Sequence, residues 1–198
     1  TNEGVGVLAA ALLFDPTIGP EVNSEGYYDV NPLVAIENPE AILQGWDQQV
    51  VTNRIYATAS IDYKIFNDLT ATARFGTNLM DSRLDLYEND KFQVGRGLNG
   101  RSSIINNEST YYISEFLANY EKTLGDHNFK VLGGITYESN QTRRHYSMAS
   151  DMLSNVTLTN LQQSGNQETL IAESGKFKNT LQSSLARINY SFKDKYLI

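Results

Sequence analysis

Apolar and polar residues alternate along this chain in segments that come in pairs. Between residues 51 and 65 nearly every second position is apolar, including Val51, Ile55, Ile61 and Ile65, and the intervening positions are mostly polar. A period of two is typical of a β-strand with one apolar and one wet face. The alternation resumes at Leu69 after only two residues, so the pattern predicts a tight β-hairpin.

Two further pairs are expected. One covers about 110–122 and 128–140 around a turn at 124–126, and the other begins near residue 180 and turns at 193–195. Positions 129 to 137 form a clean apolar face, whereas Ile113 and Leu117 stand among polar neighbours on the opposite face. The chain is therefore expected to hold about six strands of about 10 to 14 residues, long enough for a tilted crossing of a hydrocarbon layer.

The connections between the pairs are long, at about 80–109 and 141–179, and are rich in Asn, Ser, Gly and charge. Short turns on one side and long loops on the other are the layout of bacterial outer-membrane barrels. Aromatic residues such as Tyr63, Phe66, Tyr120 and Phe129 cluster beside the short turns, as in an interfacial girdle. We predict an all-β fold, a segment of an antiparallel transmembrane β-barrel. The alternative is a soluble β-sandwich, whose strands also alternate.

The strand count bears on domain organisation. A bacterial single-chain barrel needs at least about eight strands, and open edges in lipid would leave costly unpaired backbone groups. We therefore expect these 198 residues to be a piece of a longer polypeptide, with strands and loops over 50–198. Residues 1–49 are punctuated by Asn, Gly and Pro and are expected to be an extracellular loop region that precedes a strand. Within it, 7–14 is either a short helix or a buried strand.

Composition excludes several kinds of chemistry. The net charge of −7 disfavours nucleic acid as a partner, and no apolar run approaches the roughly 18 residues of a membrane helix. The chain has no Cys, only two His, and no nucleophile motif of the GxSxG type. Gly95, Gly97 and Gly100 match the GxGxxG spacing, but a loop-like composition follows them. We expect no enzyme, no catalytic residue, no cofactor and no metal site.

Two groups of residues are candidates for ligand contact. Arg54, Asp62 and Arg74, together with Lys64, lie on the polar face of the first hairpin and are expected to face the lumen. The aromatic residues of the first irregular segment form the second group: Tyr27, Tyr28 and Trp46. Either they are exposed and stack on a sugar or dock a partner, or they pack the loop onto its own barrel.

Several stretches resemble the SusC/RagA family of TonB-dependent outer-membrane transporters of Bacteroidetes. Two of them are the most specific, and the similarity extends over most of the chain from about residue 8, with 81–109 and 141–178 matching only as variable loops. The stretches are NPLVAIE (31–37), TNR (52–54), DLTATARFG (68–76), LGDHNFKVLGG (124–134) and LARINYSFKDKYL (185–197), the last two being the specific ones.

The resemblance implies a 22-stranded barrel in the outer membrane, occluded by a plug and paired with a SusD-like surface lipoprotein. Such complexes import oligosaccharides or peptides with energy delivered by TonB. The plug, the TonB box and the closing strand are expected to lie outside this chain, which would supply part of the wall. The competing expectation is a soluble β-rich carbohydrate-binding module.

Overall fold

The computed structural model describes residues 6–33, 36–91, 93–153, 160–193 and 195–197. Three short helices and six strands make up most of these residues, and two single turns of 3₁₀ helix follow the fourth strand. The elements in chain order are α1 (Val7–Leu13), α2 (Pro39–Gly45), β1 (Trp46–Phe66), β2 (Leu69–Glu88), α3 (Gln93–Arg96), β3 (Arg101–Leu124), β4 (His127–Ser150), η1 (Leu161–Gln163), η2 (Gln167–Thr169), β5 (Ile171–Phe192) and β6 (Tyr196–Leu197).

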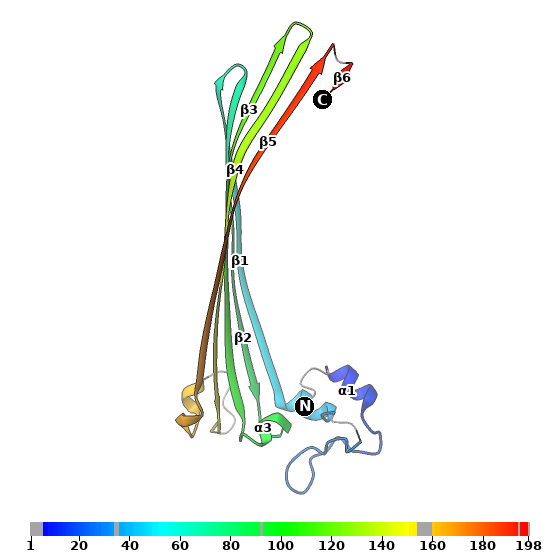
Figure 1. Ribbon diagram of the computed structural model, residues 1–198. Coiled ribbons are helices and arrows are strands. Elements are labelled where there is room, and N and C mark those ends of the chain that lie inside the picture. Colours follow the sequence, from blue (N-terminus) through cyan, green and yellow to red (C-terminus); the bar gives the residue numbers. More distant parts are fainter. Residues whose placement is uncertain (1–5, 34–35, 92, 154–159, 194, 198) are drawn as a thin grey trace. The chain divides into compact units, whose positions relative to one another are not determined.

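The strands form one antiparallel sheet. Their order in the sheet is β1-β2-β3-β4-β5-β6, the order of the sequence, so each strand pairs with the one before it (Figure 1). At the last hairpin, Ser191 pairs with Leu197 and Phe192 with Tyr196. This meander confirms the prediction of an all-β, antiparallel sheet of about six strands.

The predicted strand lengths and loop bounds were wrong. The five long strands contain 20 to 24 residues each. Only residues 89–100 separate β2 from β3, and only 151–170 separate β4 from β5, where loops at 80–109 and 141–179 were expected. The alternation of apolar and polar residues ends before the strands do, because the backbone hydrogen bonds of a sheet do not depend on it.

The short turns repeat one arrangement of contacts. The carbonyl of Asp68 accepts a hydrogen bond from the backbone N–H of Glu121, and its carboxylate accepts one from Lys122. Asp126 does the same in the next turn, where its carbonyl accepts from the N–H of Lys193 and its carboxylate lies 3.6 Å from the Lys193 ammonium. Each turn is thus tied to its neighbour by one backbone bond and one charge pair.

The chain divides into two compact units, and each long strand contributes to both. Unit 1 contains residues 1–52, 82–106 and 144–175, and unit 2 contains 53–81, 107–143 and 176–198. Unit 1 therefore holds the helices and the longer connections, whereas unit 2 holds the short turns and the alternating parts of the strands.

The N-terminal segment of unit 1 folds into a small cluster instead of the expected loop. Ala10 of α1 packs with Ile36 and Ile42, which settles residues 7–13 as a helix. The side chain of Asn38 caps α2, accepting from the N–H of Glu40 at 3.0 Å. Its amide also donates to the carbonyls of Gly19 and Asp29, both at 3.2 Å, so one buried side chain joins three parts of the segment.

The connection between β2 and β3 in unit 1 explains the glycine motif. A Cβ at Gly95 would lie 2.0 Å from the carbonyl oxygen of Asn89, and Gly100 has a φ of +83°. Gly95 serves close packing within α3, which is a single turn, and Gly100 serves a left-handed turn after it. An ion pair of Arg101 with Glu88, whose side chain is only 5% exposed, closes the connection.

Candidate functional site

The candidate residues Arg54, Asp62 and Arg74 share one polar face in unit 2. Arg54 Nε donates to Asn78 Oδ1 at 2.7 Å, and the hydroxyl of Thr72 donates to Asp62 Oδ1 at 2.5 Å. Arg74 lies 3.9 Å from Glu115 on β3. These contacts join β1, β2 and β3 on the same side of the sheet. Whether this side faces a lumen stays a prediction.

The opposite face of unit 2 is apolar and aromatic. Phe75 stacks on Tyr112 with ring centroids 6.3 Å apart, and Phe129 lies against Tyr190 at 5.0 Å. Several large apolar side chains on this face are about half exposed, including Ile135 and Tyr137. A sheet of this kind needs an apolar medium against that face.

Two apolar residues interrupt the polar face. A Cβ at Gly76 would lie 2.8 Å from a methyl of Ile113, and a Cβ at Gly134 would lie 2.4 Å from Leu117 Cδ2. Each aliphatic side chain thus covers a glycine of the neighbouring strand. This pairing explains why Ile113 and Leu117 are out of phase with the alternation of β3.

The three aromatic candidates lie in unit 1 and are engaged in packing. Tyr28 is 8% exposed, and Trp46 opens β1 and packs against the cluster of Ala10, Ile36 and Ile42. The guanidinium of Arg96 lies 4.1 Å from the ring centroid of Tyr27 and donates to the Tyr28 carbonyl at 3.0 Å. Of the two alternatives, the contacts favour packing of the segment over exposed rings.

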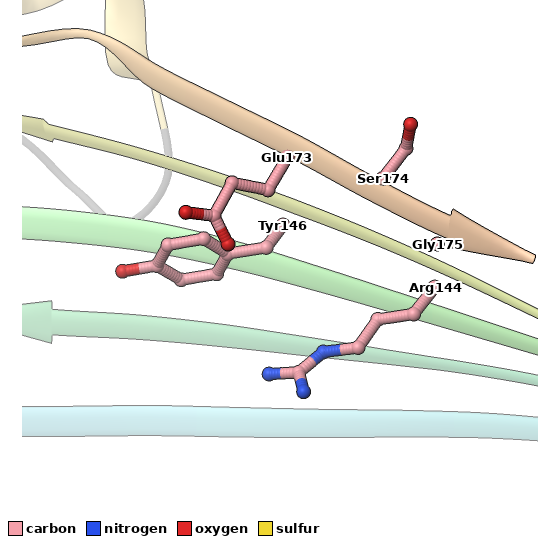
Figure 2. A pocket seen from close by; sticks show the side chains of 5 residues that line it. All are labelled: Arg144, Tyr146, Glu173, Ser174 and Gly175. Carbon is pink, nitrogen blue, oxygen red and sulfur yellow. The ribbon is translucent and has the colours of Figure 1, made fainter.

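A pocket of about 340 Å³ lies on β4 and β5 within unit 1. Its lining consists of Arg144 and Tyr146 from β4 and of Glu173, Ser174 and Gly175 from β5. Figure 2 shows the side chains of Glu173 and Ser174 leaving β5 in opposite directions. The Glu173 side chain points toward the Tyr146 ring, and Arg144 lines the same pocket from β4. Among the described residues, no side-chain hydrogen bond or ion pair engages Arg144, Tyr146 or Glu173.

The sequence reasoning missed this pocket because residues 141–179 were assigned to a loop. The available signal was parity: Arg144 and Tyr146 have the same parity as Glu138 on β4, and Glu138 accepts a hydrogen bond from the Tyr111 hydroxyl on the polar face. Polar residues on both faces concealed that signal.

A second, larger hollow of about 620 Å³ in unit 1 lies between the connections of the long strands. It is lined by Tyr87, Asn89, Asp90, Lys91, Asn99, Gly100, Met152 and Leu153. Burial, and then the nearby Asp90 carboxylate, raise the pKa of Tyr87, so its hydroxyl stays a neutral donor. In the described part of the chain no group of His, Cys, Asp and Glu side chains has the arrangement of a metal site. No helix in that part has the length and apolarity of a membrane span.

Comparison with known proteins shows the same architecture. The chain is 26% identical over 196 residues to TonB-dependent receptor P3 of Formosa agariphila, a match that covers 98% of this chain and 19% of that protein. Solved structures of the RagAB peptide importer match at 14% identity. The closed-closed state gives a TM-score of 0.72 over 84% of this chain and 19% of the solved chain, and the open-open state gives 0.68 over 80% and 18%. No family model matches.

The two-faced meander has the fold of part of a transmembrane β-barrel, and the chain is similar in sequence to a TonB-dependent receptor. Its fold corresponds to part of the matched chain in the solved RagAB structures. The chain spans about a fifth of the length of the proteins it matches. The matched proteins are receptors and importers, in agreement with the prediction that the chain is not an enzyme.

Proposed function

We propose that this chain forms part of the wall of a TonB-dependent importer that takes up oligosaccharides or peptides together with a SusD-like surface lipoprotein. The observation that carries the proposal is the two-faced sheet, whose chain matches a TonB-dependent receptor over 98% of its length. The solved RagAB structures support it because RagAB is a peptide importer.

The two faces have separate roles in this proposal. The apolar face with Phe75, Tyr112 and Phe129 contacts lipid, and the polar face with Arg54 and Arg74 lines the interior or meets the plug. The soluble carbohydrate-binding module is not retained, because the fold is that of an outer-membrane barrel.

Two measurements test the proposal. First, an antibody against residues 127–134 is applied to fractionated cells of the source organism. A band several times larger than 22.2 kDa in the outer membrane is expected, and a soluble band near that mass would refute the proposal. Second, cells that express the parent protein are depleted of TonB. Uptake of its nutrient should stop, whereas uptake that continues without TonB would overturn the energised mechanism.

The partnership with a lipoprotein has its own test. The parent protein is purified with an affinity tag in mild detergent, and co-purifying proteins are identified by mass spectrometry. A SusD-like lipoprotein in stoichiometric amount is expected, and its absence from a preparation that still binds nutrient would contradict the partnership.

A further inference from the structure

Two connections of unit 1 are joined at Asn99 by three hydrogen bonds, which together form a clasp. The Asn99 amide nitrogen donates to Asp151 Oδ1 at 2.7 Å, and the Asn99 carbonyl accepts from the backbone N–H of Met152 at 2.9 Å. The N–H of Asp151 donates to the Leu98 carbonyl at 2.7 Å. The clasp therefore ties the connection between β2 and β3 to the residues that follow β4.

Asn99 is followed by Gly100, and this is the only Asn-Gly step in the sequence. Asparagine is one of the thermolabile residues of proteins, and it reacts most readily before glycine because no side chain hinders the next backbone nitrogen. In that reaction the Gly100 nitrogen bonds to Asn99 Cγ, the Cγ–Nδ2 bond breaks, and the amide NH₂ leaves as ammonia with the proton of the Gly100 N–H. Water then opens the cyclic imide to aspartate or isoaspartate.

Hydrogen bonds hold both reacting groups in the folded chain. The Gly100 N–H donates to the Gly95 carbonyl at 2.9 Å, which restrains the attacking nitrogen. The Asp151 carboxylate restrains the amide that would leave, through a charge-assisted bond. Asn99 and Gly100 have φ angles of +50° and +83°, a left-handed turn that these bonds fix. Because the Asn99 side chain is exposed, hydrogen bonding and not burial restrains it.

We propose that Asn99 is a site of spontaneous deamidation that the clasp keeps unreactive, and that its conversion to aspartate opens the clasp. The product places a second carboxylate beside Asp151, so a hydrogen bond becomes a repulsion between two anions. Isoaspartate lengthens the backbone of a turn that is already close to Met152, since a Cβ at Gly100 would lie 3.4 Å from Met152 Cβ. The reaction consumes only water and is independent of the proposed transport.

The rate of deamidation tests the protective role of the clasp. The full-length parent protein, purified in detergent, is incubated at mildly alkaline pH and then digested with trypsin, which cuts after Arg96 and Arg101 and so isolates residues 97–101. Mass spectrometry measures the fraction of this peptide in which the amide has become an acid. The folded protein should react at least about tenfold more slowly than the same protein unfolded in guanidinium, because only the opened clasp reacts.

Variants of Asp151 show whether its carboxylate is responsible. Asp151→Gly removes the carboxylate at a φ of +59°, which glycine adopts freely, and should speed deamidation of the folded protein by about tenfold. Asp151→Asn keeps a neutral acceptor and should fall between that variant and the wild type. Gly134→Val is the matched control and should react like the wild type, because it strains β4 in unit 2 without touching the clasp. Heat-resistant mobility on a gel checks that every variant is folded.

Three results would overturn the protective role: equal rates in the folded and unfolded protein, unchanged rates in both Asp151 variants, or an equal acceleration in Gly134→Val.

Hydrogen exchange at the Met152 amide tests whether the product opens the clasp. Asn99→Asp should speed this exchange by about tenfold relative to Asn99→Gly, which removes the side-chain amide at a positive φ without adding charge. Combining Asn99→Asp with Asp151→Asn again pairs one amide with one carboxylate and should restore the wild-type exchange rate. Equal exchange in Asn99→Asp and Asn99→Gly, or no recovery in the double variant, would refute the opening.

Discussion

A charge at the centre of the apolar face is the most direct test of the orientation of the sheet. On β3 that face carries aromatic residues at Tyr112, Phe116 and Tyr120, and Phe75 packs against the first of them. The eight steps from Tyr112 to Tyr120 span about 27 Å at about 3.4 Å per residue. A tilt of about 40° reduces this to about 21 Å, close to the apolar band of about 25 Å in outer-membrane barrels. Phe116, 57% exposed, lies in the middle.

The perturbation is therefore Phe116→Arg, with Phe116→Ala as the reference that removes the ring without adding charge. Arginine at the bilayer midplane destabilises such barrels by about 2 to 4 kcal/mol. This corresponds to a shift in the folding equilibrium of about 30-fold to 900-fold between the two variants. The assay is guanidinium unfolding of the full-length parent protein in phospholipid vesicles, followed by heat-resistant gel mobility.

Asn119→Arg provides the matched control on the other face of the same strand. The Asn119 amide donates to Glu121 Oε1 at 3.1 Å, so an arginine at this position would lie beside a carboxylate in water. Its effect should stay within about 0.5 kcal/mol. Equal stability of Phe116→Arg and Phe116→Ala, or an equal loss in Asn119→Arg, would refute the assignment of the faces.

Three further outcomes are expected. Gly134→Val should lose about 1 to 3 kcal/mol, because its Cβ would lie 2.4 Å from a leucine methyl and 2.9 Å from a backbone oxygen, whereas Gly133→Val should be tolerated; equal unfolding midpoints would contradict this. Arg101→Met should lower the free energy of unfolding by about 3 to 5 kcal/mol, because it leaves the buried Glu88 carboxylate without its cation. Calorimetry would detect this loss, and adding Glu88→Gln to the same variant should recover part of the stability. The hydrogen bond and charge of Asp68 raise the pKa of Lys122 in the folded protein. The contribution of this ion pair to the stability of the fold is therefore complete below pH 10.5, the ordinary value, and is lost as the pH rises through the higher pKa of the folded state. Asp68→Asn should abolish this alkaline loss of stability in a pH series of unfolding midpoints.

Much of the meander was accessible from local pattern. The alternation from Val51 to Ile65, the two residues before Leu69, and the turn around Gly125 with its φ of +61° each depend on neighbours in the chain. These features require no knowledge of distant residues, because side-chain parity and turn geometry are local properties.

The candidate sites were less accessible. The sequence left open whether Tyr28 and Trp46 are exposed or packed. Contacts with residues far along the chain favour packing, such as the hydrogen bond of Arg96 to the Tyr28 carbonyl. The Arg144, Tyr146 and Glu173 pocket joins two strands across the 151–170 connection, and such residues carry no periodic signal when both faces of the strand have polar residues.

The sequence alone determined that the chain is a β-meander with one apolar and one polar face, because a period of two leaves each strand only one way to separate its side chains. Tertiary structure decided how far each strand continues, since backbone pairing between strands persists after the apolar pattern ends. It also decided why Ile113 and Leu117 break the pattern: each covers a glycine of the adjacent strand, and only the register between strands brings those partners together.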